Sequence, residues 1–164
     1  MPLFKYFTLL VLPLMLSIGH AQAEMPKMSY RQVKVDGVSI AYREIGNVNA
    51  PSVLLLHGVP SSSRMYEGLM RQLGDRFHLI APDYPGFGNS DAPTPDQFTY
   101  TFEHYATLIA HFTDVVGLKQ YSLFMQDYGA PVGMRLVMAR PKAVSVMVFQ
   151  NGNVYVEGLG RLPG

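Results

Sequence analysis

The residue best suited to chemistry in this sequence is a carboxylate at the junction of an apolar run and a small-residue helix. Asp127 follows the apolar run Tyr121–Met125 and precedes a helical pattern over Tyr128–Ala139. A carboxylate can displace a leaving group from saturated carbon and form an ester with the protein itself. A second motif, Leu-His-Gly-Val-Pro at Leu56–Pro60, closes another apolar run, Val53–Leu56. We expect the ends of these two runs to be neighbours in one sheet.

Two readings of Asp127 are open from the residues alone. Asp is a favoured helix N-cap, and an Asp before a helix can be only that. The preceding strand, Gly129 two residues later and the upstream His-Gly-Val-Pro motif together favour a nucleophile. The helix that starts at Tyr128 would also place a positive dipole near the carboxylate.

The elements that position these residues follow from the spacing of apolar side chains. A hairpin around Asp36-Gly37 comes first, followed by three strand–helix units and a last strand, with a long Pro- and Gly-rich loop over 82–98. This alternation predicts an α/β fold with a mostly parallel sheet and helices on both faces. The predicted strands are Tyr30–Val35, Val38–Ile45, Val53–Leu56, Phe77–Ala81, Tyr121–Met125 and Val144–Phe149, and the predicted helices are Ser63–Leu73, Phe102–Val116 and Tyr128–Ala139.

Ligands of such sheets bind beyond the carboxyl ends of the strands. His57, Asp83 and Asp127 all follow predicted strand ends, so we expect them to converge on one edge. Asp83, with Gly86 and Gly88, has the composition of a turn. We predict no metal site, because no cluster of His, Asp or Glu has the spacing of metal ligands. We also predict no cofactor, and Gly86-Phe87-Gly88 lacks the third glycine of a dinucleotide-binding fingerprint.

Composition limits the class of protein and its partners. The chain has 164 residues, of which 48% are apolar and 15% charged, as expected of one globular domain. The net charge of +1 gives no reason to expect nucleic acid or an anionic membrane as a partner. The absence of cysteine excludes disulfides and thiolate metal sites. A small molecule is the expected ligand, and the oligomeric state does not follow from the sequence.

Residues 1–23 have the pattern of a secretory signal peptide. Lys5 is followed by an uncharged stretch, and Ala21-Gln22-Ala23 provides a small-x-small cleavage site before Glu24. The alternative is a membrane anchor, for which the apolar stretch is short. We therefore expect an exported protein, periplasmic or secreted, with no membrane attachment after cleavage.

Three stretches resemble α/β-hydrolases of the haloalkane dehalogenase and epoxide hydrolase type: LLLHGVPSSSRMY, LIAPDYPGFGNSD and LFMQDYGAPVGMRL. The resemblance covers roughly Val33 to Asn153. It implies that Asp127 is the nucleophile and that the backbone N–H groups of Val59 and Tyr128 form the oxyanion hole. It also implies that four residues support this site structurally: His57, Gly58, Pro60 and Gly129. Among them, His57 would brace the oxyanion loop.

The leaving-group site departs from the dehalogenase pattern. Such enzymes usually hold the halide with a Trp after the nucleophile and with an Asn or another donor after His-Gly. Tyr128 and Val59 occupy these positions, and the chain has no Trp. A valine side chain has no donor for a halide. An epoxide hydrolase-like or other ester-forming hydrolase is therefore the leading hypothesis, and a haloalkane dehalogenase is the alternative.

The order of catalytic residues is a second departure. In α/β-hydrolases the acid and the histidine follow the nucleophile in the chain. Here no histidine follows Asp127, since the last one is His111, and the only acidic residue after Asp127 is Glu157. Glu157 is a possible acid, although a solvated loop position fits it better, and Asn151 stands where some relatives carry the acid. Without the histidine the ester would not be hydrolysed efficiently.

We therefore expect residues 24–153 to be the N-terminal part of the hydrolase domain, truncated after about the sixth strand. Residues 154–164 would begin the connection to the lid. The sheet would then expose an unpaired edge at Val144–Phe149, which favours aggregation. The alternative to a truncated enzyme is a non-catalytic hydrolase-like binding protein.

Overall fold

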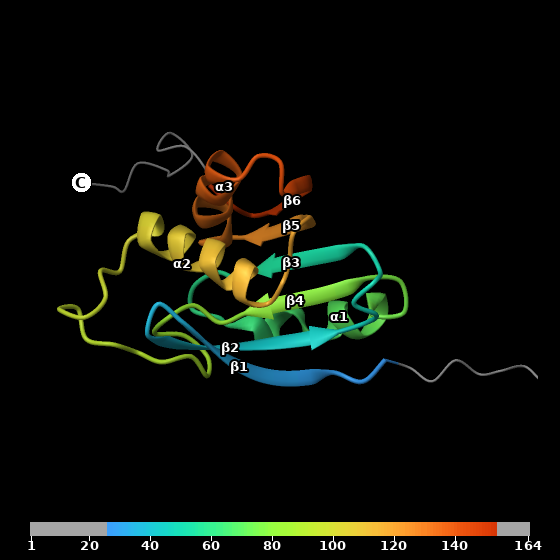
Figure 1. Ribbon diagram of the computed structural model, residues 1–164, viewed down its shortest axis with the longest axis horizontal. Coiled ribbons are helices and arrows are strands. Elements are labelled where there is room, and N and C mark those ends of the chain that lie inside the picture. Colours follow the sequence, from blue (N-terminus) through green and yellow to red (C-terminus); the bar gives the residue numbers. More distant parts are fainter. Residues whose placement is uncertain (1–25, 154–164) are drawn as a thin grey trace, which may run out of the picture.

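The computed structural model describes residues 26–153, which form one sheet with helices on both faces (Figure 1). The predicted signal peptide (1–23) and lid connection (154–164) lie outside the described residues. The elements are β1 (Ser29–Val35), β2 (Val38–Ile45), β3 (Ser52–Leu56), the 3-10 helix η1 (Ser63–Tyr66), α1 (Glu67–Leu73), β4 (His78–Pro82), α2 (Phe102–Val115), β5 (Tyr121–Gln126), α3 (Gly129–Ala139) and β6 (Val144–Gln150).

The strands form a six-stranded sheet in the order β1-β2-β4-β3-β5-β6. β1 and β2 form the predicted antiparallel hairpin, and β2 also pairs antiparallel with β4. The remaining pairs, β3 with β4, β3 with β5 and β5 with β6, are parallel. The predicted α/β fold with an N-terminal hairpin is confirmed. Leu56 pairs with Met125, so the ends of β3 and β5 are neighbours as expected.

The predicted helix Ser63–Leu73 is two elements. Its first turn, η1, is a 3-10 helix, and only Glu67–Leu73 is α-helical. The Ser62 side chain accepts a hydrogen bond from the Arg64 N–H, which caps this tight first turn. The third predicted helix begins one residue later than expected, at Gly129, and Tyr128 is its N-cap.

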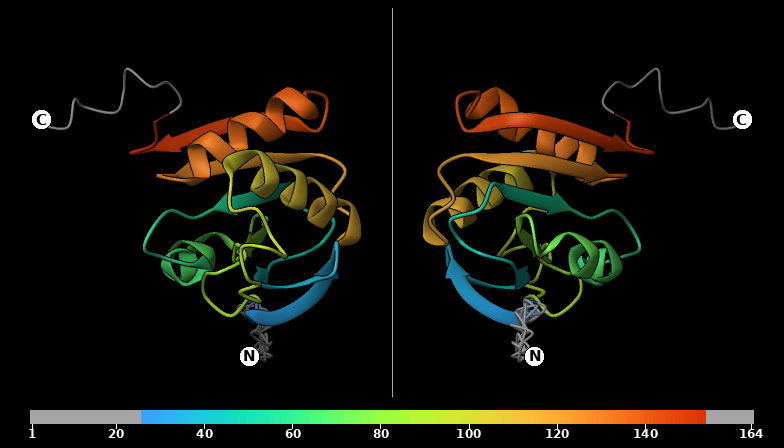
Figure 2. Two further views of the ribbon diagram at one scale, coloured as in Figure 1. Left: turned by 90° about the vertical axis from the view of Figure 1, so that its left-hand side faces the viewer. Right: turned by 90° about the vertical axis from the view of Figure 1, so that its right-hand side faces the viewer.

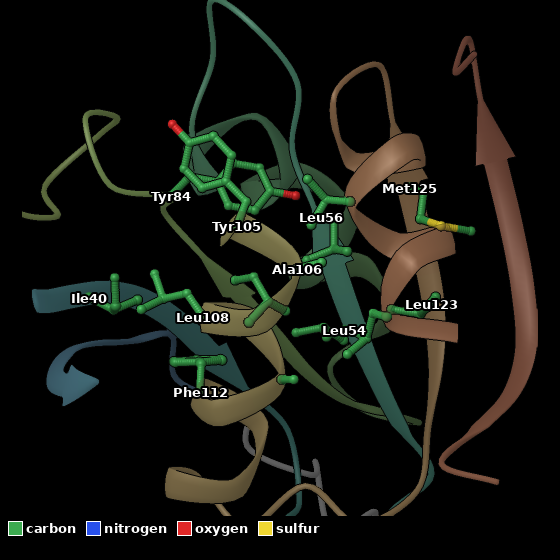
Figure 3. Packing of buried hydrophobic residues seen from close by; sticks show 14 of the residues in the cluster. Ile40, Leu54, Leu56, Tyr84, Tyr105, Ala106, Leu108, Phe112, Leu123 and Met125 are labelled. Carbon is green, nitrogen blue, oxygen red and sulfur yellow. The ribbon is translucent and has the colours of Figure 1, made fainter. Parts of the chain in front are cut away.

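The core has one hydrophobic cluster on each face of the sheet. The larger cluster joins the sheet to α2 and α3, and the smaller one joins it to η1 and α1. Figure 2 shows these helices on the two faces of the sheet. Leu54, Leu56, Leu108 and Phe112 are fully buried in the larger cluster (Figure 3). The periodic apolar positions of the sequence thus fill both layers beside β3.

β6 is an exposed edge strand. All of its residues after Val144 are solvent-exposed, on both faces of the strand. Val146, Val148 and Phe149 are 55%, 42% and 46% exposed. A strand of this apolar composition in a parallel sheet is normally covered on both faces.

Within 26–153, no helix is both long and apolar enough to cross a membrane.

Candidate active site

Asp127 lies in a tight turn between β5 and α3. Its φ is +49°, a backbone conformation that residues other than glycine seldom adopt. The turn presses the start of α3 against the end of β3, and a Cβ at Gly129 would overlap the Leu56 carbonyl oxygen. Further along α3, a Cβ at Gly133 would overlap the Met125 sulfur. Small residues therefore allow the close approach of helix and strand that raises Asp127 above the sheet edge.

The Asp127 carboxylate is held by the loop that follows β3. The Val59 backbone N–H donates to Asp127 Oδ1 at 2.9 Å. Gly58 has no space for a side chain, because a Cβ there would overlap Asp127 Cβ. Tyr128, the other predicted oxyanion donor, is the N-cap of α3 with φ −58°. Its amide belongs to the positive end of an 11-residue helix, which favours a negative charge at this point.

His57 is completely buried below the Val59 loop and bonds to backbone at both ring nitrogens. Nδ1 lies 2.9 Å from the Gly58 carbonyl oxygen, and the Tyr84 N–H lies 3.2 Å from Nε2. A neutral ring that donates from Nδ1 and accepts at Nε2 satisfies both contacts. Burial lowers the pKa of His57, although the Gly58 carbonyl and Asp83 oppose this. The geometry is that of a bracing residue and leaves no free nitrogen for proton transfer.

The three motifs follow the ends of the neighbouring parallel strands β4, β3 and β5, so they meet at one edge of the sheet as expected, but only the loop after His57 contacts the Asp127 carboxylate directly. His57 and its loop meet Asp127 through Val59, as described above. Asp83 is 1% exposed and instead accepts hydrogen bonds from the N–H groups of Ser63 and Asn89, at 2.7 and 2.9 Å. Its contacts are therefore with the neighbouring loops, and within 26–153 no metal-type cluster of side chains forms around it.

Apolar side chains flank the carboxylate on the solvent side. Val59 and Tyr128 are 39% and 41% exposed, and Asp127 between them is partly buried. The Tyr128 ring packs edge-on against Phe102, with centroids 5.0 Å apart. Phe102 belongs to α2, and reasoning from the sequence missed its place here. Local spacing holds no signal for this contact, because 26 residues separate the two rings in the chain.

The other described histidines bond elsewhere. None of them has Asp127 as a hydrogen-bond partner, so the described residues place no histidine base at the carboxylate. Their partners are Glu44 and Ser52 for His78, the Thr99 carbonyl for His104 and Asp36 for His111. The candidate acid Glu157 lies outside the described residues.

A strand, a tight turn bearing a carboxylate, a helix and a backbone donor from the neighbouring strand end define a hydrolase-type site at the carboxyl edge of the sheet. The chain belongs to the alpha/beta hydrolase fold family, whose sequence profile matches residues 51–161. Among curated proteins it is similar to an uncharacterized hydrolase of Saccharomyces cerevisiae, with 42% identity over 124 residues. It is also similar to haloalkane dehalogenase 2 of Mycobacterium tuberculosis, with 39% identity over 101 residues.

Solved structures agree with this assignment. The haloalkane dehalogenase DbeA from Bradyrhizobium elkani superposes with a TM-score of 0.72 at 33% identity, covering 77% of this chain and 42% of that one. The aligned regions cover 76% of this chain and 42% of the yeast relative, and 62% and 35% in the mycobacterial comparison. The chain thus spans about two fifths of the length of these relatives.

Proposed function

We propose that this chain carries the nucleophile and oxyanion loop of a hydrolase that acts on a small organic substrate through a covalent Asp127 ester. The observation that carries the proposal is the 2.9 Å hydrogen bond from the Val59 N–H to Asp127 Oδ1. It joins a carboxylate in a strained turn to a fixed backbone donor. A helix cap alone requires neither a positive φ nor a donor from another strand.

The chemistry has two steps. In the first, an Asp127 oxygen attacks a saturated carbon, a C–O ester bond forms, and the bond from carbon to the leaving atom breaks. In the second, water attacks the carbonyl carbon of Asp127, and negative charge grows on its oxygen. The Val59 N–H already points at that oxygen, and loss of one such donor typically costs about 3 kcal/mol of barrier. One proton of the water goes to the leaving oxygen, so that the alcohol departs, and the other is released, so that Asp127 regains its carboxylate with one oxygen from water.

The flanking side chains support an epoxide as the substrate class. Opening an epoxide leaves an alkoxide on the substrate itself, which needs a proton and no halide-binding cradle. Val59 presents only methyl groups on the solvent side, and Tyr128 presents a phenol that can donate to oxygen. The partly apolar surroundings suit a small apolar body on the substrate.

A haloalkane dehalogenase is the second candidate, and the named relatives favour it. The mycobacterial and Bradyrhizobium proteins bear that name at 39% and 33% identity. Both candidates use the same ester and differ in the leaving atom. A third candidate, a non-catalytic binding protein, is favoured by the lack of a histidine partner for Asp127 among residues 26–153.

The test is a single turnover of the complete gene product in heavy-oxygen water, with styrene oxide or bromobutane as the probe. We expect label in the Asp127 carboxylate, located by peptide mass spectrometry, and faster turnover of styrene oxide. Asp127→Asn should abolish turnover, apart from slow recovery by deamidation. Turnover without label in Asp127 contradicts the covalent mechanism, and faster release of bromide selects the dehalogenase. Binding of either probe without turnover selects the binding protein.

We also propose that the protein is exported after cleavage between Ala23 and Glu24. The support is the charge and apolar pattern of residues 1–23. Terminal sequencing of the protein recovered from the periplasm or medium should begin at Glu24. Recovery of an intact Met1 in the cytoplasm would contradict export.

A further inference from the structure

The loop that carries the Val59 donor is anchored at its two ends. It runs from His57 to Ser63, and both of these residues are completely buried. Between them, Val59 and Pro60 are exposed to solvent. The position of the Val59 N–H relative to Asp127 therefore depends on the two anchors.

Both anchors are held by two consecutive residues after β4. At the first, His57 accepts a hydrogen bond from the Tyr84 backbone N–H at 3.2 Å, and its other nitrogen holds the Gly58 carbonyl. At the second, Asp83 Oδ1 accepts a hydrogen bond from the Ser63 N–H at 2.7 Å. One rigid point on the sheet edge thus fixes the start and the end of the loop.

The Asp83 carboxylate is itself immobilised. Its second oxygen accepts from the Asn89 N–H at 2.9 Å, and its own backbone N–H donates to the Ala41 carbonyl at 2.8 Å. Gly88, with φ +55°, lies against the carboxylate so closely that a Cβ there would overlap Oδ2. The buried Arg43 guanidinium donates to the Ser63 hydroxyl at 2.7 Å and brings a positive charge to the same anchor.

We propose that Asp83 is a positioning residue that sets the Val59 N–H against Asp127. The proposal rests on the proposed function, in which this N–H stabilises developing charge on the nucleophile. A carboxylate suits the position because each of its oxygens accepts one backbone N–H, whereas an amide has a single acceptor oxygen. An oxyanion donor is effective only within a narrow range of positions, so a small shift of the loop weakens it.

The first test replaces Asp83 by Asn in the complete gene product. The new NH₂ group would face either the Ser63 or the Asn89 N–H, and we expect kcat for styrene oxide to fall about 10- to 100-fold with little change in KM. Asp91→Asn is the matched control. Asp91 Oδ2 also accepts a backbone N–H, that of Ser39 at 2.9 Å, from the same long loop but away from the Val59 loop. The kcat of Asp91→Asn for styrene oxide should stay near that of the wild type.

A second pair of variants covers the case in which Asp83→Asn fails to fold. The methyl group added by Gly88→Ala would overlap the Asp83 carboxylate, whereas the nearest atoms to the one added by Gly86→Ala belong to the Tyr100 ring, at 3.3 Å or more. Both glycines have positive φ, +55° and +83°, so both substitutions strain the backbone. Only Gly88→Ala should lower kcat by the factor expected for Asp83→Asn.

The deciding readout is independent of turnover. In isotope-labelled protein, Asp83→Asn and Gly88→Ala should shift the Val59 amide proton resonance and speed its exchange with solvent, and the two controls should leave both unchanged. An unaltered Val59 amide in folded Asp83→Asn or Gly88→Ala overturns the positioning role, whatever the kinetics. A wild-type enzyme that turns over styrene oxide without labelling Asp127 overturns the proposed mechanism and leaves the amide measurement to decide the role of Asp83.

Discussion

Asp127 combines a positive φ with a half-buried carboxylate whose Oδ1 is bound by a backbone N–H. A strained conformation persists only where its surroundings determine it. Here they include Gly58, where a Cβ would overlap Asp127 itself, and Gly129, where a Cβ would overlap the Leu56 carbonyl oxygen. At the scale of single residues, the site therefore depends on two glycines as much as on the carboxylate.

Gly58→Ala tests this dependence. The added methyl group would overlap Asp127 Cβ and Oδ1, so the carboxylate must move away from the Val59 N–H. We expect turnover by the complete gene product to fall about 100-fold or more, the scale of a lost oxyanion donor. Gly68→Ala is the control, because nothing lies within 4 Å of a Cβ at this helical glycine. It should keep activity and stabilise the fold by about 0.5–1 kcal/mol. Equal activity of both variants would contradict the crowding at Gly58.

The buried His57 predicts a pH effect on stability. Burial lowers its pKa below the ordinary value of 6.5, so the unfolded chain binds a proton at a pH where the folded chain does not. The neutral His57 ring therefore contributes fully to the free energy of unfolding above pH 6.5, and this contribution is lost as the pH falls from 6.5 towards the pKa of His57 in the folded chain. The free energy of unfolding, measured by denaturant melts at each pH, should change with pH more steeply in the wild type than in His57→Gln over this range. The difference in steepness should be up to about 1.4 kcal/mol per pH unit. Parallel pH profiles would contradict the buried neutral ring.

At the scale of elements, β3 is the strand on which the site is built. It pairs with β4 on one side and β5 on the other, and both core clusters pack against it. Its last residue, Leu56, packs beside the start of α3 and accepts a hydrogen bond from the Tyr66 hydroxyl at 2.8 Å. This bond ties η1 to the strand end that precedes the loop with the Val59 N–H.

Two tyrosine-to-phenylalanine variants should have different effects on the free energy of unfolding. Tyr66→Phe removes a buried hydrogen bond to Leu56 and should cost about 1 kcal/mol of unfolding free energy. The Tyr84 hydroxyl is also buried but has no hydrogen-bond partner within residues 26–153. Tyr84→Phe removes an unpaired polar group and should be neutral or stabilising by about 1 kcal/mol. Equilibrium urea unfolding measures both, and an equal loss in the two variants would show that the Tyr84 hydroxyl is bonded.

At the scale of the whole molecule, the two edges of the described sheet differ in the chemistry of their exposed side chains. The hairpin side of the sheet ends in β1, where most of the exposed residues are charged or polar: Arg31, Gln32 and Lys34. The opposite side ends in β6, whose apolar side chains are exposed on both faces. An apolar, unpaired edge of this kind can template pairing with another chain.

Val146→Lys with Val148→Lys tests this open edge in the 164-residue chain. The two valines are 55% and 42% exposed, so charge should be tolerated there and should raise the concentration at which the chain aggregates, with a near-unchanged Tm. Val48→Lys, at a 68% exposed loop valine, is the control and should leave the aggregation threshold where it was. Light scattering during concentration measures the threshold. An equal gain in both proteins would show that added charge, not the β6 edge, is responsible.

Much of the fold could be predicted from the sequence because its elements are defined by near neighbours. Alternating residues define the hairpin, and Tyr105, Leu108 and Phe112 mark the buried side of α2 by their helical spacing. The position of Asp127 between a strand and a helix follows from the same local patterns. The split of the first helix into η1 and α1 was missed, because the Ser62 cap and the buried contacts of Ser63 decide it.

The sequence by itself determined the order of the elements, the carboxylate at the strand–helix turn and the residue types beside it. The meeting of Val59 with Asp127, 68 residues away, was expected from the resemblance and is seen as a hydrogen bond, but only the tertiary structure showed that Asp83 holds Ser63 across 20 residues. Local periodicity reflects neighbours one or two turns away. The pairing of β3 with both β4 and β5 is set by which distant apolar surfaces pack together, and this pairing brings the site together.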